Sequence, residues 1–226
     1  MSLLKLLPTH PVSCGGFATL ALMLLLQHHP ATAQQAGMGN SLDEHAGHDM
    51  HQHDHRHHHE VAPGYQRSLA SYPVPAVTLV NQDGQQVDLP ELLKADRPVM
   101  LNFIFTSCTA ICPAMSAIFA QVQTELGRES ARLRMVSVSI DPEYDTPEAL
   151  NAYARRFGAG PQWEFLTGSL DDSIAVQRAF DADRGDKMNH APLTLFRAKP
   201  DAQWVRYEGF ATAAQLVEEY RGTVTD

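Results

Sequence analysis

Short apolar runs and a helical stripe alternate along the chain from about residue 72 onward. The segment Val99–Phe105 is a nearly unbroken apolar run, which is typical of a central strand covered on both faces. Between Met115 and Leu126 apolar residues recur at helical spacing, so a helix is expected soon after that strand. A second apolar run, Leu133–Ile140, predicts a neighbouring strand. The pattern therefore places a strand, a helix and a strand at the centre of the domain.

Turn residues separate further apolar stretches on either side of this centre. Val77–Val80 and Gln86–Leu89 flank the turn Asn81–Gly84, which predicts a hairpin. Leu193–Phe196 and Trp204–Tyr207 lie around a proline-containing turn and predict a second hairpin. Both hairpins belong at the edges of the sheet, because the central strands alternate with helices.

Three more helices and one short strand complete the expected elements. Thr146 precedes a proline, as an N-cap residue does at a helix start, and helices are also expected over Asp171–Phe180 and Thr212–Tyr220. Phe165–Thr167 predicts a short strand. Together the elements predict an α/β, thioredoxin-like fold with a mixed central sheet, helices on both faces and edge hairpins.

Length and charge limit the classes of function. The chain has 226 residues, which suits one ordinary domain, expected over residues 72–226, with a terminal extension. Its formal net charge is -9. A nucleic-acid partner is therefore not expected, since such proteins normally present a basic face.

Residues 1–33 have the pattern of an export signal. Lys5 lies near the start, Phe17–Leu26 is apolar, and Ala31–Ala33 ends in the small-x-small pattern of a cleavage site. Cys14 precedes the apolar run, so it leaves with the signal and is not a lipidation site. The run is short for a membrane span, so membrane association is expected only if the signal stays uncleaved. The expected location is the bacterial periplasm or cell envelope.

Residues 34–71 are predicted to be a disordered, histidine-rich tether, because nothing in them can build a core. Its imidazoles suit borderline divalent metal ions, so metal capture is the favoured role and a low-complexity accident is the alternative. These auxiliary metal-binding candidates are His45, His48, His51, His53, His55, His57, His58 and His59.

Two cysteines carry the chemistry of the globular part. Cys108 falls in the turn between the first central strand and its helix, and Cys112 falls near the first helical residues. Unsatisfied N–H groups at a helix start favour a thiolate, which attacks disulfides and binds soft metals. The Cys-x3-Cys spacing can open around an ion or close to a disulfide. Metal binding and redox chemistry therefore both remain open.

His190 is the only histidine from residue 61 to the C-terminus and stands just before the strand at Leu193. In a thioredoxin-like topology that loop lies beside the cysteine turn. Two thiolates and one imidazole suit Cu(I) and, as a second oxidation state, Cu(II). The alternative is a histidine with no ligand role, which is the usual reading of a lone histidine.

The residues around these positions resemble the Sco/SenC family of copper-binding, thioredoxin-fold proteins. The resemblance rests on Asn102–Pro113, Val136–Glu148 and the pair Asn189-His190, in that order. It implies that Cys108, Cys112 and His190 bind copper for delivery to the binuclear copper site of a respiratory oxidase subunit or a similar cuproenzyme. The alternative implied by the family is a thiol-disulfide oxidoreductase that reduces the target's cysteines and needs a thiol reductant.

Two positions depart from the family pattern or add to it. Thr109 stands where many members have proline after the first cysteine, and Pro192 resembles the cis-proline of thiol-disulfide enzymes, which favours a redox role. A peroxidase shares the fold, but such enzymes usually have a threonine three residues before the reactive cysteine, where this chain has Phe105. A peroxidase is therefore the third alternative.

Four further residues are candidates for supporting roles. Asp141 and Asp145 either approach the thiols and His190 or, as such residues more often do, shape a turn and a helix start. Met115 and Met188 are soft donors, but Met115 shares the apolar helical stripe and is expected in the core. The role of Met188 stays open.

Overall fold

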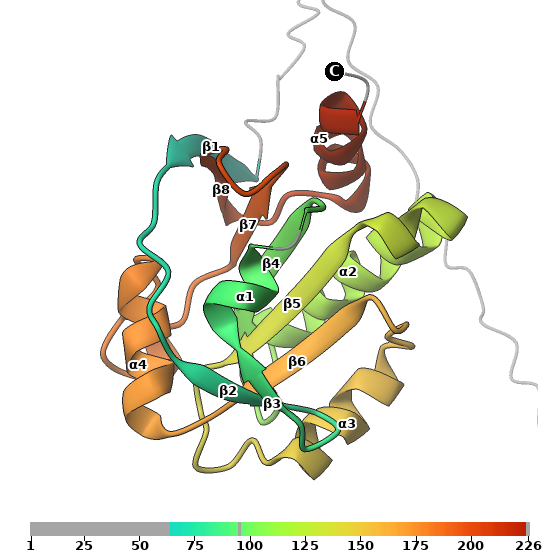
Figure 1. Ribbon diagram of the computed structural model, residues 1–226. Helices are drawn as coiled ribbons and strands as arrows, with labels where there is room; N and C mark the ends of the chain where they lie inside the picture. Colours follow the sequence, from blue (N-terminus) through green and yellow to red (C-terminus); the bar gives the residue numbers. More distant parts are fainter. Residues whose placement is uncertain (1–63, 95, 225–226) are drawn as a thin grey trace, which may run out of the picture. The chain divides into compact units, whose positions relative to one another are not determined.

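A computed structural model describes residues 64–94 and 96–224, which build an eight-stranded sheet (Figure 1). Its strand order is β1-β8-β7-β4-β5-β6-β2-β3. The strands are β1 (Tyr65–Ala70), β2 (Thr78–Asn81), β3 (Gln86–Asp88), β4 (Val99–Ile104), β5 (Arg134–Ser139), β6 (Trp163–Thr167), β7 (Leu193–Arg197) and β8 (Trp204–Gly209).

The sheet is mixed, as the sequence predicts. β4, β5 and β6 run parallel, and β7 joins β4 in the antiparallel sense. The two predicted hairpins are confirmed as β2–β3 and β7–β8. The first lies at an edge of the sheet, as predicted, but the second does not, because β1 pairs with the outer side of β8. The parallel strands thus form the centre, and antiparallel strands extend the sheet on both sides.

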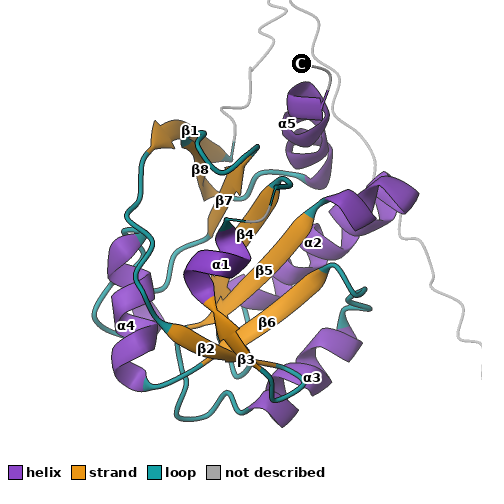
Figure 2. Cartoon of the chain, in the orientation of Figure 1, coloured by secondary structure: helices purple, strands orange, loops and turns teal. Residues whose placement is uncertain are grey.

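Helices cover both faces of this sheet (Figure 2). The α-helices are α1 (Leu89–Leu93), α2 (Ile111–Leu126), α3 (Pro147–Arg156), α4 (Leu170–Ala179) and α5 (Ala213–Val224), and η1 (Gly127–Arg132) and η2 (Lys187–Asn189) are short 3-10 helices. One hydrophobic core lies beneath α2, α3 and α5, and a second lies beneath α1 and α4. The α/β fold with a mixed central sheet and helices on both faces is confirmed.

β4 owes its central place to side chains that pack on both faces. All six of its residues are buried. Leu101 and Phe103 enter the core beneath α1 and α4, whereas Met100 and Ile104 enter the core beneath α2. This alternation of faces is the period-2 geometry of a strand, and burial on both sides explains the unbroken apolar run.

The start of the globular part differs from the predicted boundary. Residues 65–70, which the sequence places in the tether, form β1 and pair with β8 along its whole length. Four of the six residues are exposed, so β1 lacks the apolar alternation that signals a strand. Besides the backbone pairing with β8, Tyr65 packs on Tyr207, and Arg67 pairs with Glu219 of α5. The domain therefore begins at least seven residues earlier than residue 72.

Side-chain caps fix several helix starts. Thr146 accepts a hydrogen bond from the N–H of Ala149, which confirms the predicted start of α3. Ser169 caps α4 in the same way, so that helix starts one residue before the predicted Asp171. The short helix α1 was not predicted. Asp88 caps it, so β3 ends at Asp88, one residue before the predicted end at Leu89.

The predicted export signal and the histidine-rich segment 45–59 lie outside the described residues. Within residues 64–94 and 96–224, no helix is both long enough and apolar enough to cross a membrane.

Candidate metal and redox centre

The two cysteines lie where β4 passes into α2, as the sequence predicts. Cys108 is half-buried in the turn and Cys112 is the second residue of α2. The N–H of Cys108 donates to the carbonyl of Phe105 at 3.2 Å, which closes the turn. Both cysteines are free thiols.

The sulfur of Cys108 accepts a backbone hydrogen bond at the start of α2, as a capping side chain does. Ala110 at the N-cap of α2 offers no side-chain acceptor, while the N–H of Cys112 donates to Cys108 Sγ at 3.3 Å. Burial by itself raises the pKa of Cys108, but the backbone N–H groups of Cys112, Ala110 and Ile111, with the Cys112 thiol, outweigh it and lower that pKa. Cys108 is therefore the thiol more readily deprotonated.

Cys112 is in the opposite situation. Its side chain is 0% exposed and belongs to the hydrophobic core beneath α2. Burial raises the pKa of Cys112; the N–H of Phe105, which donates to its sulfur at 3.5 Å, acts against this, and the neighbouring Cys108 adds to it. The pair thus combines one accessible, more acidic thiol with one buried, protonated thiol.

A buried carboxylate stabilises the cysteine turn through hydrogen bonds. Asp145 is fully buried and accepts hydrogen bonds from the N–H of Thr106 at 3.1 Å and from its hydroxyl at 2.5 Å. Ser139 at the end of β5 donates to the same carboxylate at 2.6 Å. The sequence left open whether Asp145 approaches the site, and the structure shows that it fixes the residue two before Cys108.

His190 directly follows η2 and lies three residues before the start of β7, in the loop that the sequence predicts beside the cysteines. It is 7% exposed, and its ring lies edge-on to Phe105 with the centroids 6.4 Å apart. Burial lowers the pKa of His190; a hydrogen bond to the backbone of Phe103 opposes this, and Arg184 adds to it. The imidazole is therefore neutral near pH 7, which is the form that binds metals.

One nitrogen of this imidazole has no partner. Nε2 of His190 is buried, and no atom of the described residues hydrogen-bonds to it. A buried polar atom without a partner costs on the order of 1–3 kcal/mol, so this nitrogen is a candidate ligand atom.

Cys108 and His190 open into one pocket of about 200 Å³ between the cysteine turn and η2. Phe105, Lys187 and Met188 contribute to the same wall. Cys112 is not part of the lining, and in the described residues no three His, Cys, Asp or Glu side chains lie close enough together to hold a metal ion. Cys108 thus contacts Cys112 and shares a pocket with His190. The three expected ligands do not form one cluster, because the side chain of Cys112 is packed in the core.

An ion pair anchors the segment that carries His190. Lys187 Nζ lies 2.6 Å from Asp141 Oδ2, and the carboxylate of Asp141 is almost fully buried. The ammonium group also lies 4.7 Å from the ring centroid of Tyr144. Asp141 therefore acts on the site through Lys187, a contact that the sequence did not indicate.

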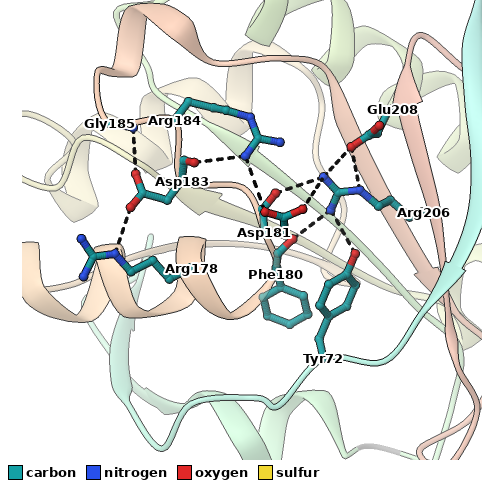
Figure 3. Close-up of polar contacts among 9 residues, drawn as sticks. All are labelled: Tyr72, Arg178, Phe180, Asp181, Asp183, Arg184, Gly185, Arg206 and Glu208. Carbon is teal, nitrogen blue, oxygen red and sulfur yellow. Dashed lines mark hydrogen bonds and ion pairs between the residues drawn. The ribbon is translucent and has the colours of Figure 1, made fainter.

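A buried arginine anchors the other end of the same segment (Figure 3). Arg206 of β8 donates to the carbonyls of Phe180 and Asp181 at 2.9 and 3.0 Å and to the hydroxyl of Tyr72 at 3.0 Å. Glu208 accepts from the same guanidinium at 2.7 Å. The chain thus leaves α4 in a fixed direction toward η2. Sequence reasoning missed Arg206, although a charged residue within an apolar strand is a signal for a buried partner.

The remaining sequence expectations have mixed outcomes. Met115 lies in the core, as predicted, whereas Met188 is 74% exposed. The expectation of a cis-proline at Pro192 is wrong, since the described residues contain no cis peptide bond. The proline follows His190 in an extended loop and gives no support to a redox role.

Fold and site together define a thioredoxin-like domain with a thiol pair at a helix start and a buried histidine beside it. The SCO1/SenC family model matches residues 69–218. The chain therefore belongs to the SCO1/SenC family.

Individual relatives agree with this assignment. The SCO1 protein homolog of Bacillus subtilis (strain 168) is 40% identical over 105 residues, which are 46% of this chain and 53% of the relative. A relative from Stutzerimonas stutzeri, whose name describes it as a candidate copper-binding protein, is 33% identical over 110 residues, or 47% of this chain and 50% of the relative. The match therefore spans about half the length of these curated relatives.

A solved structure extends the comparison to the whole domain. BsSco, described as a member of the Sco family of cytochrome c oxidase assembly proteins with a disulfide switch, superposes with a TM-score of 0.59 at 29% identity. The match covers 70% of this chain and 96% of the BsSco chain.

Proposed function

We propose that this protein is a copper chaperone that carries one copper ion between Cys108, Cys112 and His190. The observation that carries the proposal is the buried, unpartnered Nε2 of His190, a residue that lines the same pocket as Cys108. A thiolate and a neutral imidazole are ligands that Cu(I) accepts, and Cu(II) accepts them as well.

The geometry suggests an order of binding. Cys108 is half-exposed and its thiol is the more acidic one, so it loses its proton and takes up the cargo first. His190 lines the same pocket and, being neutral, can bind the ion through Nε2 without first losing a proton. Cys112 already contacts Cys108 and would complete the site once its side chain leaves the core and its thiol releases a proton to solvent. Release to a partner by ligand exchange reverses these steps.

The relatives supply the partner and the cargo of this proposal. The B. subtilis and S. stutzeri proteins and BsSco are linked by their descriptions to SCO1, to copper binding and to cytochrome c oxidase assembly, respectively. The receiving protein proposed here is accordingly a respiratory oxidase subunit with a binuclear copper site, or a similar cuproenzyme.

The test is a Cu(I) titration of the reduced chain against a competing chelator, with the eight tract histidines replaced by serine so that they cannot bind copper. Near one Cu(I) per chain is expected. His190→Gln should weaken the affinity by about 10–100-fold or more. Asn189→Ala changes the exposed neighbour of His190 and serves as the matched control, with little effect expected. Equal affinity in all three chains would contradict the proposal.

A second candidate function is thiol-disulfide exchange, favoured by the opposite pKa shifts of the two cysteines. The Cys108 thiolate attacks a partner disulfide, forms a mixed disulfide and releases one partner thiolate. The Cys112 thiol then loses its proton and displaces the second partner thiolate, which leaves Cys108 and Cys112 oxidised to a disulfide. A thiol reductant must restore the pair. The description of a disulfide switch in BsSco supports this candidate.

Trapping distinguishes this second function from copper delivery. A Cys112→Ser chain lacks the resolving thiol and should accumulate a mixed disulfide through Cys108 with an oxidised partner. A Cys108→Ser chain is the control, because its remaining thiol is buried. Absence of any adduct with Cys112→Ser would remove the oxidoreductase from consideration and leave copper delivery untouched.

Export and the histidine-rich segment complete the proposal. We expect cleavage after Ala33, which the mass of the protein recovered from the cell envelope would show. The eight tract histidines are expected to bind borderline divalent metals and to leave the Cu(I) affinity of the cysteine site unchanged. A Cu(I) affinity that falls on their replacement would show that the segment contributes to the site.

A further inference from the structure

A second sulfur donor lies in the wall of the pocket that Cys108 and His190 share. Met188 belongs to η2, two residues before His190, and lines the same pocket of about 200 Å³. The other methionines of the described residues, Met100, Met115 and Met135, are buried in the core, with exposed fractions of at most 1%. Met188 is 74% exposed. It is therefore the one described methionine whose thioether can meet a ligand from solution.

The backbone that carries Met188 is held in place on both sides. Asp186 Oδ1 accepts the N–H of Met188 at 2.8 Å, and the carbonyl of Asp186 accepts the N–H of Asn189 at 2.9 Å. Lys187 is anchored to Asp141. A flexible thioether side chain thus extends from a fixed turn, which lets the sulfur adjust its position without moving His190.

The chemistry of the donor set favours a soft ion. A thioether carries no proton and no charge, and it binds Cu(I) in preference to harder ions. Cys112, by contrast, is 0% exposed and absent from the pocket lining. The residues that line the pocket and can bind Cu(I) are therefore the two sulfur donors Cys108 and Met188 and the imidazole of His190.

We propose that Met188 is a further copper ligand, which binds the ion together with Cys108 and His190 before Cys112 joins. This inference rests on the proposed copper-carrying function. A single exposed apolar residue is ordinary on a protein surface, so the sulfur and not the apolar character must be tested. Leucine has a similar volume and no donor atom, which makes Met188→Leu the decisive change.

The first experiment compares Cu(I) affinities by chelator competition, in full-length chains whose tract histidines are replaced by serine. Met188→Leu should weaken the affinity by about tenfold, the lower end of the range known for changing residues that support a metal's ligands. Met115→Leu makes the same substitution in the core and is the matched control, with unchanged affinity expected. Because Met188 is exposed, Met188→Leu should also leave the thermal unfolding temperature unchanged.

The second experiment looks for the bond itself. In selenomethionine-labelled chain loaded with Cu(I), selenium K-edge absorption should show copper in the first shell of selenium, and Met188→Leu should abolish that signal. The same copper-to-selenium signal in both chains would assign it to another methionine and overturn the inference.

The outcomes separate this inference from the proposed function. One Cu(I) per chain, lost affinity in His190→Gln and an unchanged affinity in Met188→Leu would overturn the role of Met188 alone. A chain that binds no Cu(I) in any form would overturn both.

Discussion

The two regions that meet at the site are positioned in different ways. The cysteine turn, residues 105–112, follows directly from β4 and leads into α2, so local succession of strand and helix places it. The histidine arm, residues 181–192, is irregular apart from η2 and is held by distant side chains, above all Arg206 and Asp141. One half of the site is therefore built by the backbone of the sheet, and the other half by side-chain contacts between distant parts of the sequence.

This difference predicts the effect of substitutions in each region. A substitution that disrupts the turn should also disturb the central strands and lower the free energy of unfolding of the whole domain. A substitution that disrupts the arm should increase the mobility of His190 locally and leave the surroundings of the two thiols unchanged.

The largest effect is expected at the base of the turn. Asp145→Ala removes the buried acceptor of three hydrogen bonds and strands the N–H of Thr106, so the free energy of unfolding should fall by roughly 3 kcal/mol. Chemical denaturation measures this. Asp201→Ala alters an exposed carboxylate in the β7–β8 turn and should change it by less than about 0.5 kcal/mol. Similar losses in the two variants would show that Asp145 does not hold the turn.

A smaller and more local effect is expected from Arg206→Met. The substitution leaves the carbonyls of Phe180 and Asp181 without their donor, and we expect a loss of about 2 kcal/mol. Hydrogen exchange should accelerate in residues 180–190 and stay unchanged in residues 111–126. Arg178→Met removes an exposed arginine of the same network and is the control. Faster exchange in α2 would mean that turn and arm are not separate units.

The Asp141–Lys187 ion pair should contribute less to the free energy of unfolding than the contacts of Arg206 do. A double-mutant cycle with Asp141→Asn and Lys187→Met is expected to give a coupling energy of about 1 kcal/mol, since the carboxylate is buried. The exposed pair Glu91–Lys94 should give only about 0.3 kcal/mol. Equal coupling in the two pairs would show that Lys187 does not anchor the arm.

The smallest effect is a pH dependence that belongs to the arm. Burial holds the pKa of His190 below its ordinary value of 6.5, so just below pH 6.5 the unfolded chain binds a proton that the folded chain does not. Stability must therefore fall as the pH drops through the window between 6.5 and the lowered pKa. The apo wild type should lose more stability between about pH 7.5 and pH 5 than His190→Gln, which lacks the titrating group. Parallel curves for the two chains would refute a lowered pKa.

The same contrast explains how much the sequence predicts. The strand at 99–104 and the start of α2 follow from local apolar periodicity, so the positions of Cys108 and Cys112 could be predicted directly. The place of His190 required a topology, because the loop before the strand at Leu193 lies beside the cysteine turn only once the thioredoxin-like sheet is assembled. Its supports, Arg206 and Lys187, lie far in sequence from the residues they contact, and no local pattern marks such pairs.

Two differences between the sequence predictions and the structure have the same physical origin. β1 is a strand because β8 supplies its hydrogen bonds, not because its own residues alternate in polarity. The three expected ligands are not gathered into one cluster because the core beneath α2 retains Cys112, and the packing of a side chain cannot be read from Cys-x3-Cys spacing.

The most direct test of the account is the ligand set of bound copper. Copper K-edge absorption of the reduced, Cu(I)-loaded chain, with the tract histidines replaced by serine, should show sulfur and one imidazole in the first shell. The sulfur signal should fall in Cys108→Ser, and the imidazole signal should vanish in His190→Gln. A first shell without sulfur, or an imidazole signal that survives in His190→Gln, would contradict a copper site built from the cysteine turn and the histidine arm.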